Sequence, residues 1–284
     1  MILIADCGST KCDWSLINNG KVDSEYYTQG FNPYFHSEEE IIAGIHVNTK
    51  LVDVSHQVKL IRYLGAGCST KEMTERVKGA LEKVFINAKV IVEHDLLGAA
   101  FATYQGEPAI TGILGTGSNV CYFDGKNLHQ KTPSLGFIMG DEGSGAYFGK
   151  KLVTAFCYGW LPKEVEDDFV NTYNLTASEL IGKVNSQPHA NVFLASLMPF
   201  VTKNKANPYI NKMVVDGMDA YFKTHVLCFE NAKEVKIHFV GSIAHFWDDA
   251  IYSVAHKYGL TIGQIIQKPG SMVVDYFLKY GIKS

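Results

Sequence analysis

The stretch that decides how this sequence is interpreted is Ile113-Leu114-Gly115-Thr116-Gly117-Ser118-Asn119. It follows the apolar pair Ala109-Ile110 and leads into the apolar segment 120–123, so the pattern predicts a strand, a tight glycine turn and a second strand. Two glycines with threonine and serine leave main-chain N–H groups and hydroxyls room to close on a phosphate or a sugar. An ordinary hairpin turn has the same composition, because glycine and serine favour turns anyway.

A second hairpin of the same kind opens the chain. Residues 2–5 form a short apolar strand that ends at Asp6-Cys7-Gly8-Ser9-Thr10-Lys11, and the alternation over 12–17 predicts the next strand. A two-residue turn signal at 18–20 then leads into a third strand. The same order of strand, glycine turn, strand, turn and strand returns over residues 109–131. We therefore expect an internal duplication of architecture, with two lobes of one plan facing each other across a cleft.

The remaining segments predict a mixed α/β layer in each lobe. Ser37 with Glu40, and Ser69 with Glu72, are capping boxes that each predict a helix start. Strands and helices then alternate as expected of an α/β fold, and the stretch of about 159–230 is largely helical. We expect an N-terminal lobe over 1–107 and a C-terminal lobe over 108–284 that carries this helical insertion. The last helix, at about 272–280, is a candidate to pack back toward the first lobe.

Composition narrows the class of protein. The chain has 284 residues, of which 46% are hydrophobic and 19% charged, and its net charge is −3 with both signs mixed along the length. That balance predicts no nucleic-acid partner, and no apolar run is long enough to predict a membrane span. The first five residues are too short for a signal peptide, so we expect a cytoplasmic protein. The six cysteines form no C-x-x-C pair, and we expect no structural metal.

Several polar clusters share one placement, at the ends of predicted apolar strands. These clusters are 6–11, Asp95, 115–119 and Gly241-Ser242. Ligands bind at such strand ends in open α/β sheets. Two glycine hairpins with carboxylates beside them suit an Mg²⁺-bound nucleoside triphosphate, since phosphates need convergent donors and the metal needs oxygen ligands. Neither a Walker-type phosphate loop nor a dinucleotide fingerprint is present.

Three motifs carry a resemblance to a known family. They are Asp-x-Gly-x-Thr-Lys at 6–11, Leu-Gly-Thr-Gly-Ser-Asn at 114–119 and Leu-Gly-x-x-Met-Gly-Asp-Glu-Gly-Ser at 135–144. Together they resemble the N-acetylglucosamine kinase branch of the BadF/BadG/BcrA/BcrD-type ATPases, within the superfamily of sugar kinases, actin and the large heat-shock chaperones. The resemblance covers residues 1 to about 150 well and recovers near Val240-Gly241-Ser242. It implies an α/β fold with two ribonuclease H-like lobes of the actin-like ATPase type, and a homodimer.

The resemblance also implies an activity and a role for each motif. The activity is phosphorylation of an amino sugar by ATP, with Asp6 holding Mg²⁺ directly or through water and Asp95 taking the proton from the attacking hydroxyl. The residues expected to contact ATP are Gly8, Ser9, Thr10, Lys11, Gly115, Thr116, Gly117, Gly241 and Ser242. Those expected to bind the sugar are Asn32, Asp95, Ser118, Asn119, Gly136 and Asp141.

Several of these residues could instead have a purely structural role. Asp95 could be only a helix N-cap, Asp141 could favour the N-terminus of the following helix, and Asn32 could be a turn residue. Lys11 could be a solvated turn lysine, and His94 is expected to pack or to hydrogen-bond rather than to react. Two other functions fit the same fold: a non-catalytic sugar or nucleotide sensor, and an ATP-driven dehydratase activator, which would need paired cysteines for an iron–sulfur cluster.

Overall fold

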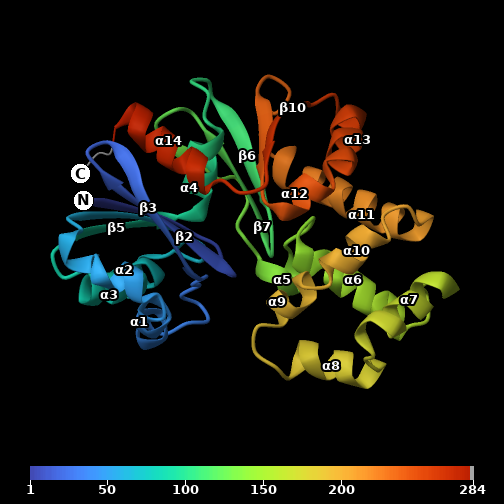
Figure 1. The fold of residues 1–284 in the computed structure, drawn as a ribbon. Coiled ribbons are helices and arrows are strands. Elements are labelled where there is room, and N and C mark those ends of the chain that lie inside the picture. The colour runs from blue at the N-terminus through green and yellow to red at the C-terminus, as the bar shows by residue number, and fades with distance from the viewer. Residues whose placement is uncertain (282–284) are drawn as a thin grey trace. The chain divides into compact units, whose positions relative to one another are not determined.

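The computed structural model describes residues 1–281 and divides into two units by its internal contacts. The first unit comprises residues 1–105 together with the C-terminal segment from Lys268, and the second comprises 106–267. Each unit is built on one five-stranded sheet (Figure 1). The predicted lobe bounds, 1–107 and 108–284, stay a prediction about domains, because contact units need not be folding domains.

The sheet of the first unit combines an antiparallel meander with two parallel strands. Its strand order is β3-β2-β1-β4-β5, in which β1, β2 and β3 pair antiparallel and β1, β4 and β5 pair parallel. The strands are β1 (Ile2–Cys7), β2 (Lys11–Asn18), β3 (Lys21–Gln29), β4 (Leu60–Gly65) and β5 (Lys89–His94). The carboxyl ends of β1, β4 and β5 therefore meet at one edge of this sheet, where the first hairpin also lies.

Helices cover both faces of this sheet. They are α1 (Glu38–His46), α2 (Thr49–Asp53), the 3-10 turn η1 (Ser55–Gln57), α3 (Lys71–Val84), α4 (Asp95–Thr103) and α14 (Gly270–Tyr280). Figure 1 shows α1, α2 and α3 on one face, with α4 and α14 on the other. The last helix packs on α4, where the rings of Phe101 and Tyr276 stack at 4.0 Å and Phe277 lies 5.1 Å from the buried guanidinium of Arg62.

The second unit repeats the plan of the first. Its strand order is β10-β9-β6-β7-β8, with β6, β7 and β8 antiparallel and β6, β9 and β10 parallel. The strands are β6 (Ala109–Leu114), β7 (Ser118–Phe123), β8 (Leu128–His129), β9 (Lys236–Val240) and β10 (Thr261–Ile266). Read from the meander inward, both sheets have the same order, which confirms the predicted duplication and the α/β fold with two actin-like ATPase lobes.

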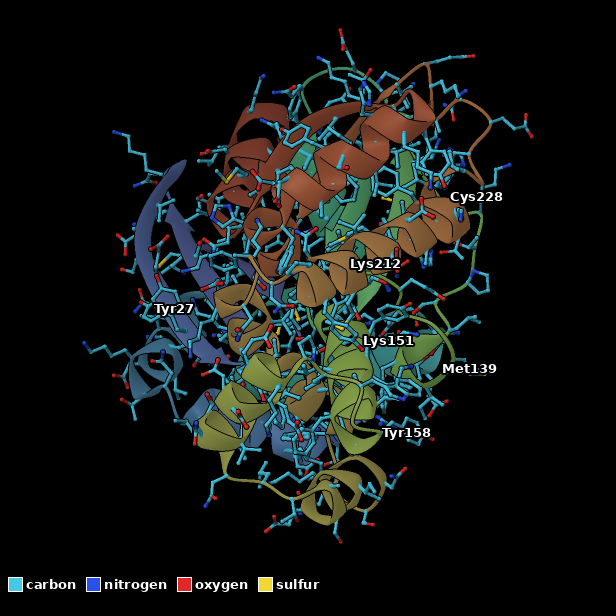
Figure 2. The ribbon with its side chains drawn as sticks, turned by 90° about the vertical axis from the view of Figure 1, so that its right-hand side faces the viewer. Tyr27, Met139, Lys151, Tyr158, Lys212 and Cys228 are labelled. Carbon is cyan, nitrogen blue, oxygen red and sulfur yellow. The ribbon has the colours of Figure 1, made fainter. Side chains whose placement is uncertain are left out.

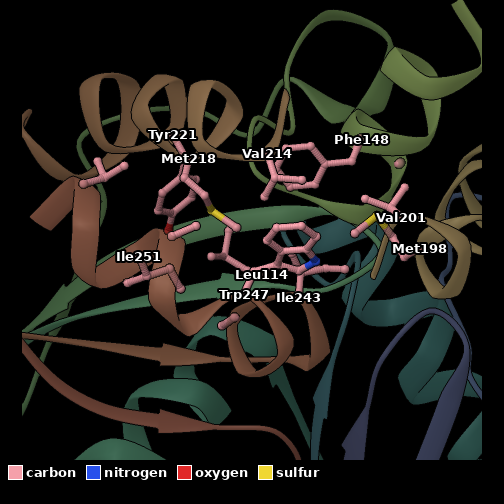
Figure 3. Packing of buried hydrophobic residues seen from close by; sticks show 14 of the residues in the cluster. Leu114, Phe148, Met198, Val201, Val214, Met218, Tyr221, Ile243, Trp247 and Ile251 are labelled. Atoms are coloured by element: carbon pink, nitrogen blue, oxygen red, sulfur yellow. The ribbon is translucent and has the colours of Figure 1, made fainter. Parts of the chain in front are cut away.

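The helices of the second unit fall mainly between β8 and β9. In chain order they are α5 (Gly136–Met139), α6 (Gly145–Cys157), α7 (Lys163–Tyr173), α8 (Ala177–Asn185), α9 (Ala190–Ala195), α10 (Met198–Lys203), α11 (Pro208–Tyr221) and the π-helical turn η2 (Phe222–Val226). Two more, α12 (Ser242–Phe246) and α13 (Asp248–Tyr258), follow β9. Figure 3 shows their shared core, in which Phe148 of α6, Met218 and Tyr221 of α11 and Trp247 meet the strand residue Leu114.

Several local predictions can be compared with the structure. Ser37 and Glu40 form the predicted capping box at the start of α1, with Oγ and Oε2 each accepting the other residue's main-chain N–H. The second predicted box is wrong by one residue, since Thr70 caps α3 by accepting from Met73 N at 3.3 Å. Ser69 instead lies 3.2 Å from the hydroxyl of Tyr34.

The helical segment between β9 and β10 is divided into α12 and α13, which meet at Trp247. The side chain of Trp247 is fully buried, and its indole N–H donates to Thr202 Oγ1 at 3.3 Å. Anchoring this large ring in the core outweighs helix continuity, and no glycine or proline marks the break in the sequence. Among the described residues no helix is both long and apolar enough to cross a membrane.

Candidate functional site

The first hairpin closes tightly after β1. Gly8 N donates to Lys11 O at 2.9 Å, which leaves Ser9 and Thr10 at the tip of the turn. Gly30, at the end of β3, lies directly against this turn. A Cβ on Gly30 would stand 2.5 Å from the carbonyl carbon of Ser9, and closer still to Gly8 O and Thr10 N. The turn can therefore keep its conformation only because residue 30 has no side chain.

Lys11 is paired within the first unit. Its Nζ lies 2.6 Å from Asp13 Oδ1 and 4.2 Å from the ring centroid of Tyr27 on β3. Half of the lysine side chain remains exposed, so its charge would need to exchange the Asp13 carboxylate for a phosphate oxygen to serve the predicted role. Lys11 is therefore neither an unpaired turn lysine nor a lysine already positioned to bind a ligand.

Three carboxylates of the first unit influence one another: Asp6 at the end of β1, Asp13 opposite it on β2, and Asp95 at the start of α4. Burial raises the pKa of Asp6 to about 7, and the charges of Asp13 and Asp95 add to the rise while Lys11 opposes it. Like charges held together in this way are relieved by a divalent cation.

These carboxylates fit Mg²⁺ held largely through water. Within residues 1–281 no three His, Cys, Asp or Glu side chains are arranged to hold a metal ion between them. Mg²⁺ commonly binds through one or two carboxylates and keeps several waters, with further ligands from substrate phosphates. Sequence reasoning missed Asp13, although its place opposite Asp6 in the hairpin register could have revealed it.

Asp95 is the first residue of α4 and not its N-cap. His94 is the N-cap, and its Nδ1 accepts from Leu96 N at 3.2 Å. The same Nδ1 lies 2.8 Å from Asp95 Oδ1. Asp95 Oδ1 is buried. It has no hydrogen-bond donor among the described residues, because a nitrogen that accepts from Leu96 N cannot at once donate to Asp95. An orphaned buried carboxylate oxygen is costly, and it is suited to accept a proton from a ligand hydroxyl.

The carboxylate of Asp95 also affects the charge of His94. Burial lowers the pKa of His94, but the neighbouring carboxylate of Asp95 outweighs burial and the net pKa is raised. Protonation of Nδ1 would turn the 2.8 Å contact into an ion pair. The hydrogen bond that His94 makes is the one from Leu96 N, and the expectation that it packs or hydrogen-bonds rather than reacts stays a prediction.

Asn32 is tied into the loop that follows β3. Its Oδ1 accepts from Tyr34 N at 3.0 Å, which is an Asx turn, and its Nδ2 donates to Ser9 Oγ at 3.3 Å. The alternative in which Asn32 is a turn residue therefore applies to its carboxamide oxygen. The amide nitrogen links this loop to the first hairpin, so Asn32 and Ser9 lie together in the first unit.

The second hairpin is held from both sides within the second unit. Gly115 N donates to Gly117 O at 3.0 Å, and the carbonyls of Gly115 and Thr116 accept from the first turn of α6 at 2.8 and 3.1 Å. Gly241 lies on the other side with φ +122°, and a Cβ there would stand 2.7 Å from the carbonyl carbon of Leu114. Gly241 therefore lies directly beside the hairpin, and the exposed Ser242 follows it as the first residue of α12.

Ser118 and Asp141 form a partly buried polar pair in this unit. The carboxylate of Asp141 accepts a hydrogen bond from Ser118 N, and Asp141 has φ +56°, a conformation that is uncommon outside glycine. Burial raises the pKa of Asp141 to about 6; the Ser118 N–H and Lys150 oppose the rise, and Glu142 adds to it. The hydroxyl Oγ of Ser118 is buried and has no hydrogen-bond partner among the described residues. Unusual backbone and an orphaned hydroxyl together mark this as a ligand-site candidate.

Asp141 does not belong to the helix that follows it. Ser144 is the N-cap of α6, accepting from Tyr147 N at 3.1 Å, and the first turn of α6 holds no acidic residue. The alternative in which Asp141 favours that helix N-terminus is therefore not supported. Asn119 has its Oδ1 engaged by Val120 N and Gln130, so its amide nitrogen is the group left to reach a ligand.

Gly136 begins α5 and stands apart from that polar group. No heavy atom of the described chain lies within 4 Å of where its side chain would be. Its carbonyl accepts from Gly140 N at 2.8 Å, so Gly136 shares a loop with Asp141 without being brought against Ser118. Figure 2 looks onto the face of this unit where Met139 of α5 and Tyr158 at the end of α6 lie exposed.

No protein-family model matches the sequence, and no curated protein does. A solved structure of the Putative N-acetylglucosamine Kinase from Porphyromonas gingivalis is similar over 98% of this chain and 99% of its own, with 32% identity and a TM-score of 0.92.

Two more distant structures share the fold. The Putative N-acetylglucosamine Kinase from Chromobacterium violaceum is 12% identical over 97% of this chain and 98% of its own, with a TM-score of 0.64. A ROK family glucokinase from Streptomyces griseus, solved with glucose and AMPPNP, is 15% identical over 98% and 99%, with a TM-score of 0.56.

Proposed function

Because this chain belongs to the family of sugar kinases that includes the Porphyromonas gingivalis protein, we propose that it transfers the γ-phosphoryl group of ATP to a hydroxyl of an amino sugar. The full-length likeness at 32% identity carries the proposal, and the name of that relative points to N-acetylglucosamine or a related hexosamine. The Streptomyces griseus glucokinase, whose structure contains glucose and AMPPNP, supports the use of a sugar and ATP on this fold.

The first unit would supply the groups for metal and phosphate. Mg²⁺, when bound, would neutralise negative charge on the phosphate oxygens. Asp6 would hold it, directly or through water, and Asp13 would contribute negative charge beside it. The main-chain N–H groups and hydroxyls of Ser9 and Thr10 would contact the phosphates, in a turn whose shape Gly30 preserves. Lys11 would reach a phosphate oxygen by leaving Asp13.

Asp95 would act on the sugar hydroxyl. The orphaned Oδ1 would accept the hydroxyl proton as the oxygen attacks the γ-phosphorus in line with the leaving group. His94, whose Nδ1 accepts from Leu96 N, would lie 2.8 Å from Asp95 Oδ1 without donating to it. Asn32 would contact the sugar through the remaining N–H of its amide.

The second unit holds its own set of residues proposed for ligand contacts. Gly115, Thr116 and Gly117 would approach the phosphates, and Gly241 with Ser242 would lie against the adenosine. The hydroxyl of Ser118, the amide nitrogen of Asn119 and the carboxylate of Asp141 would bind sugar hydroxyls. Gly136 would contribute only through main-chain atoms.

A coupled ADP-release assay over a panel of hexosamines tests the proposal. The panel holds N-acetylglucosamine, N-acetylmuramic acid, glucosamine, N-acetylmannosamine and glucose, each with Mg²⁺ and ATP. We expect sugar-dependent ADP release that is strongest with one of the amino sugars. Binding of sugar and ATP without ADP release would favour the sensor, and strongest release with glucose would contradict the amino-sugar assignment.

A further inference from the structure

A π-helical turn supports the Asn119 and Asp141 side of the second unit from a distant part of the chain. Helix α11 ends at Tyr221, and the next five residues form the turn η2. The hydroxyl of Tyr221 donates to the main-chain carbonyl of Asn119 at 2.9 Å, although the two residues are 102 positions apart. Turns of this kind are rare and occur frequently at functional sites.

His225 lies in this turn and carries a polar group into the interior. Its side chain is only 7% exposed, and its ring lies 4.9 Å from the ring of Tyr221. Nδ1 is 3.3 Å from Thr132 Oγ1, and Nε2 is 3.4 Å from Glu142 Oε2. Nε2 is buried and makes no hydrogen bond within the described residues, so a slight approach of Glu142 would complete one.

Glu142 is the link to the proposed sugar contacts. It directly follows Asp141, whose backbone has the uncommon positive φ and whose carboxylate holds Ser118 N. Such a backbone persists only where its surroundings fix it. His225 and Tyr221 hold two sides of the same loop system, one at Glu142 and one at Asn119.

The neutral ring is sufficient for this contact. Burial lowers the pKa of His225, although Glu142 opposes that, so the neutral form predominates at pH 7. With Thr132 donating to Nδ1, the ring proton lies on Nε2 and faces the Glu142 carboxylate. An apolar ring would fill the same volume at less cost, since burying an imidazole without full pairing is unfavourable.

We propose that His225 is a positioning residue for amino-sugar binding: Glu142 closes the 3.4 Å gap to Nε2, accepts a hydrogen bond from it, and thereby fixes Asp141 and the Ser118 main chain. The proposal rests on the proposed sugar kinase function and adds a residue that contacts no substrate. Its effect should fall on the sugar and leave the nucleotide contacts unchanged.

Four variants test the proposal by steady-state kinetics, with KM for sugar and for ATP measured separately. His225→Ala should raise the sugar KM about tenfold, within the range expected for residues of one hydrogen-bond network, with kcat and the ATP KM within about twofold. His225→Gln should restore the sugar KM to within about threefold, because its amide nitrogen can reach Glu142. His225→Asn should resemble His225→Ala, because its shorter amide reaches only Thr132.

The control is His238→Asn, at a second buried histidine of the same unit. Nδ1 of His238 accepts from Gln264 N at 2.7 Å, which an asparagine oxygen can replace, and nothing joins it to Asp141. We expect its sugar KM to match the unaltered protein. Equal sugar KM values for His225→Ala and His225→Gln, whether both raised or both unchanged, would overturn the proposal.

The proposed function is judged separately, on the unaltered chain. If that chain releases no ADP with any hexosamine, the kinase reaction fails. The sugar dissociation constants of the same variants, measured by calorimetry, then test His225 without turnover: the Ala-to-Gln rescue would support the positioning role, and its absence would overturn it.

Discussion

Replacing Gly30 with alanine should impair phosphoryl transfer by displacing the first hairpin, although Gly30 itself is assigned no contact with a ligand. The new Cβ would stand 2.5 Å from the carbonyl carbon of Ser9, and real Cβ contacts stay at 3.0 Å or beyond. The hairpin must therefore move by at least 0.5 Å (3.0 − 2.5). Since misplacing a reacting group by 1 Å can cost about 10²-fold, we expect kcat/KM for ATP to fall on the order of 10- to 100-fold.

The assay is ADP release at saturating sugar with ATP varied, and the matched control is Gly79→Ala. The heavy atoms nearest to a Cβ at Gly79, on α3 of the same unit, would be carboxylate atoms of Glu38 at 3.1–3.3 Å. They are the far end of a flexible, partly exposed side chain paired with Lys83, which can shift by a few tenths of an ångström. Melting curves of both variants check that each is folded at the assay temperature. A folded Gly30→Ala protein with kcat/KM for ATP within about twofold of the unaltered protein would refute the role of Gly30 in shaping the hairpin.

Three further predictions concern the carboxylates and the second hairpin. Asp95→Asn should lower kcat by about 10²–10⁴-fold. The dissociation constants for sugar and ATP, measured by calorimetry, should stay within about threefold. Unchanged kcat would show that Asp95 is not the base. The raised pKa of Asp6 means that the folded state holds a proton more tightly than the unfolded state, so metal-free stability should be lost as pH rises from about 4 toward 7. Asp6→Asn should accordingly raise the free energy of unfolding of the metal-free protein at pH 8 by about 1–2 kcal/mol, measured by urea unfolding. This is less than the full value of about 1.4 kcal/mol per pKa unit, because solvent access reduces it. Equal free energies of unfolding for the two proteins at pH 8 would contradict the pKa argument. Gly241→Ala should raise the ATP KM about tenfold or more, since its Cβ would press on the main chain of Leu114, and an unaltered ATP KM would show that the strand end adjusts freely.

Much of the fold was predictable because it depends on near neighbours in the chain. The alternation over residues 12–17 and the glycine turns predict the two meanders, and the apolar spacing along α3 predicts its buried face, Met73, Val77, Leu81 and Val84. The reciprocal contacts of Ser37 and Glu40 span only three residues, so the sequence shows them directly. The motif order alone predicts that two units share one plan, and the strand orders confirm it.

The candidate site was predicted as a set of strand ends but not as a set of contacts. Asp13, Gly30 and Tyr221 were missed because none lies in a motif, and each matters only through what the folded chain places against it. His94 rather than Asp95 caps α4, a choice between adjacent residues that depends on side-chain direction. The pairing of Lys11 with Asp13 was likewise not visible in the spacing.

The amino-acid sequence by itself therefore determined the two glycine hairpins, the duplicated order of strands and the residue types available at each strand end. Periodicity, turns and caps are properties of residues within a few positions of one another, which a linear pattern records. Only the tertiary structure decided which groups are buried without partners, as at Asp95 and Ser118, and which distant side chains support them, as Tyr221 supports Asn119. Burial and pairing depend on every segment packed around an atom, and those segments come from positions as much as 102 residues away.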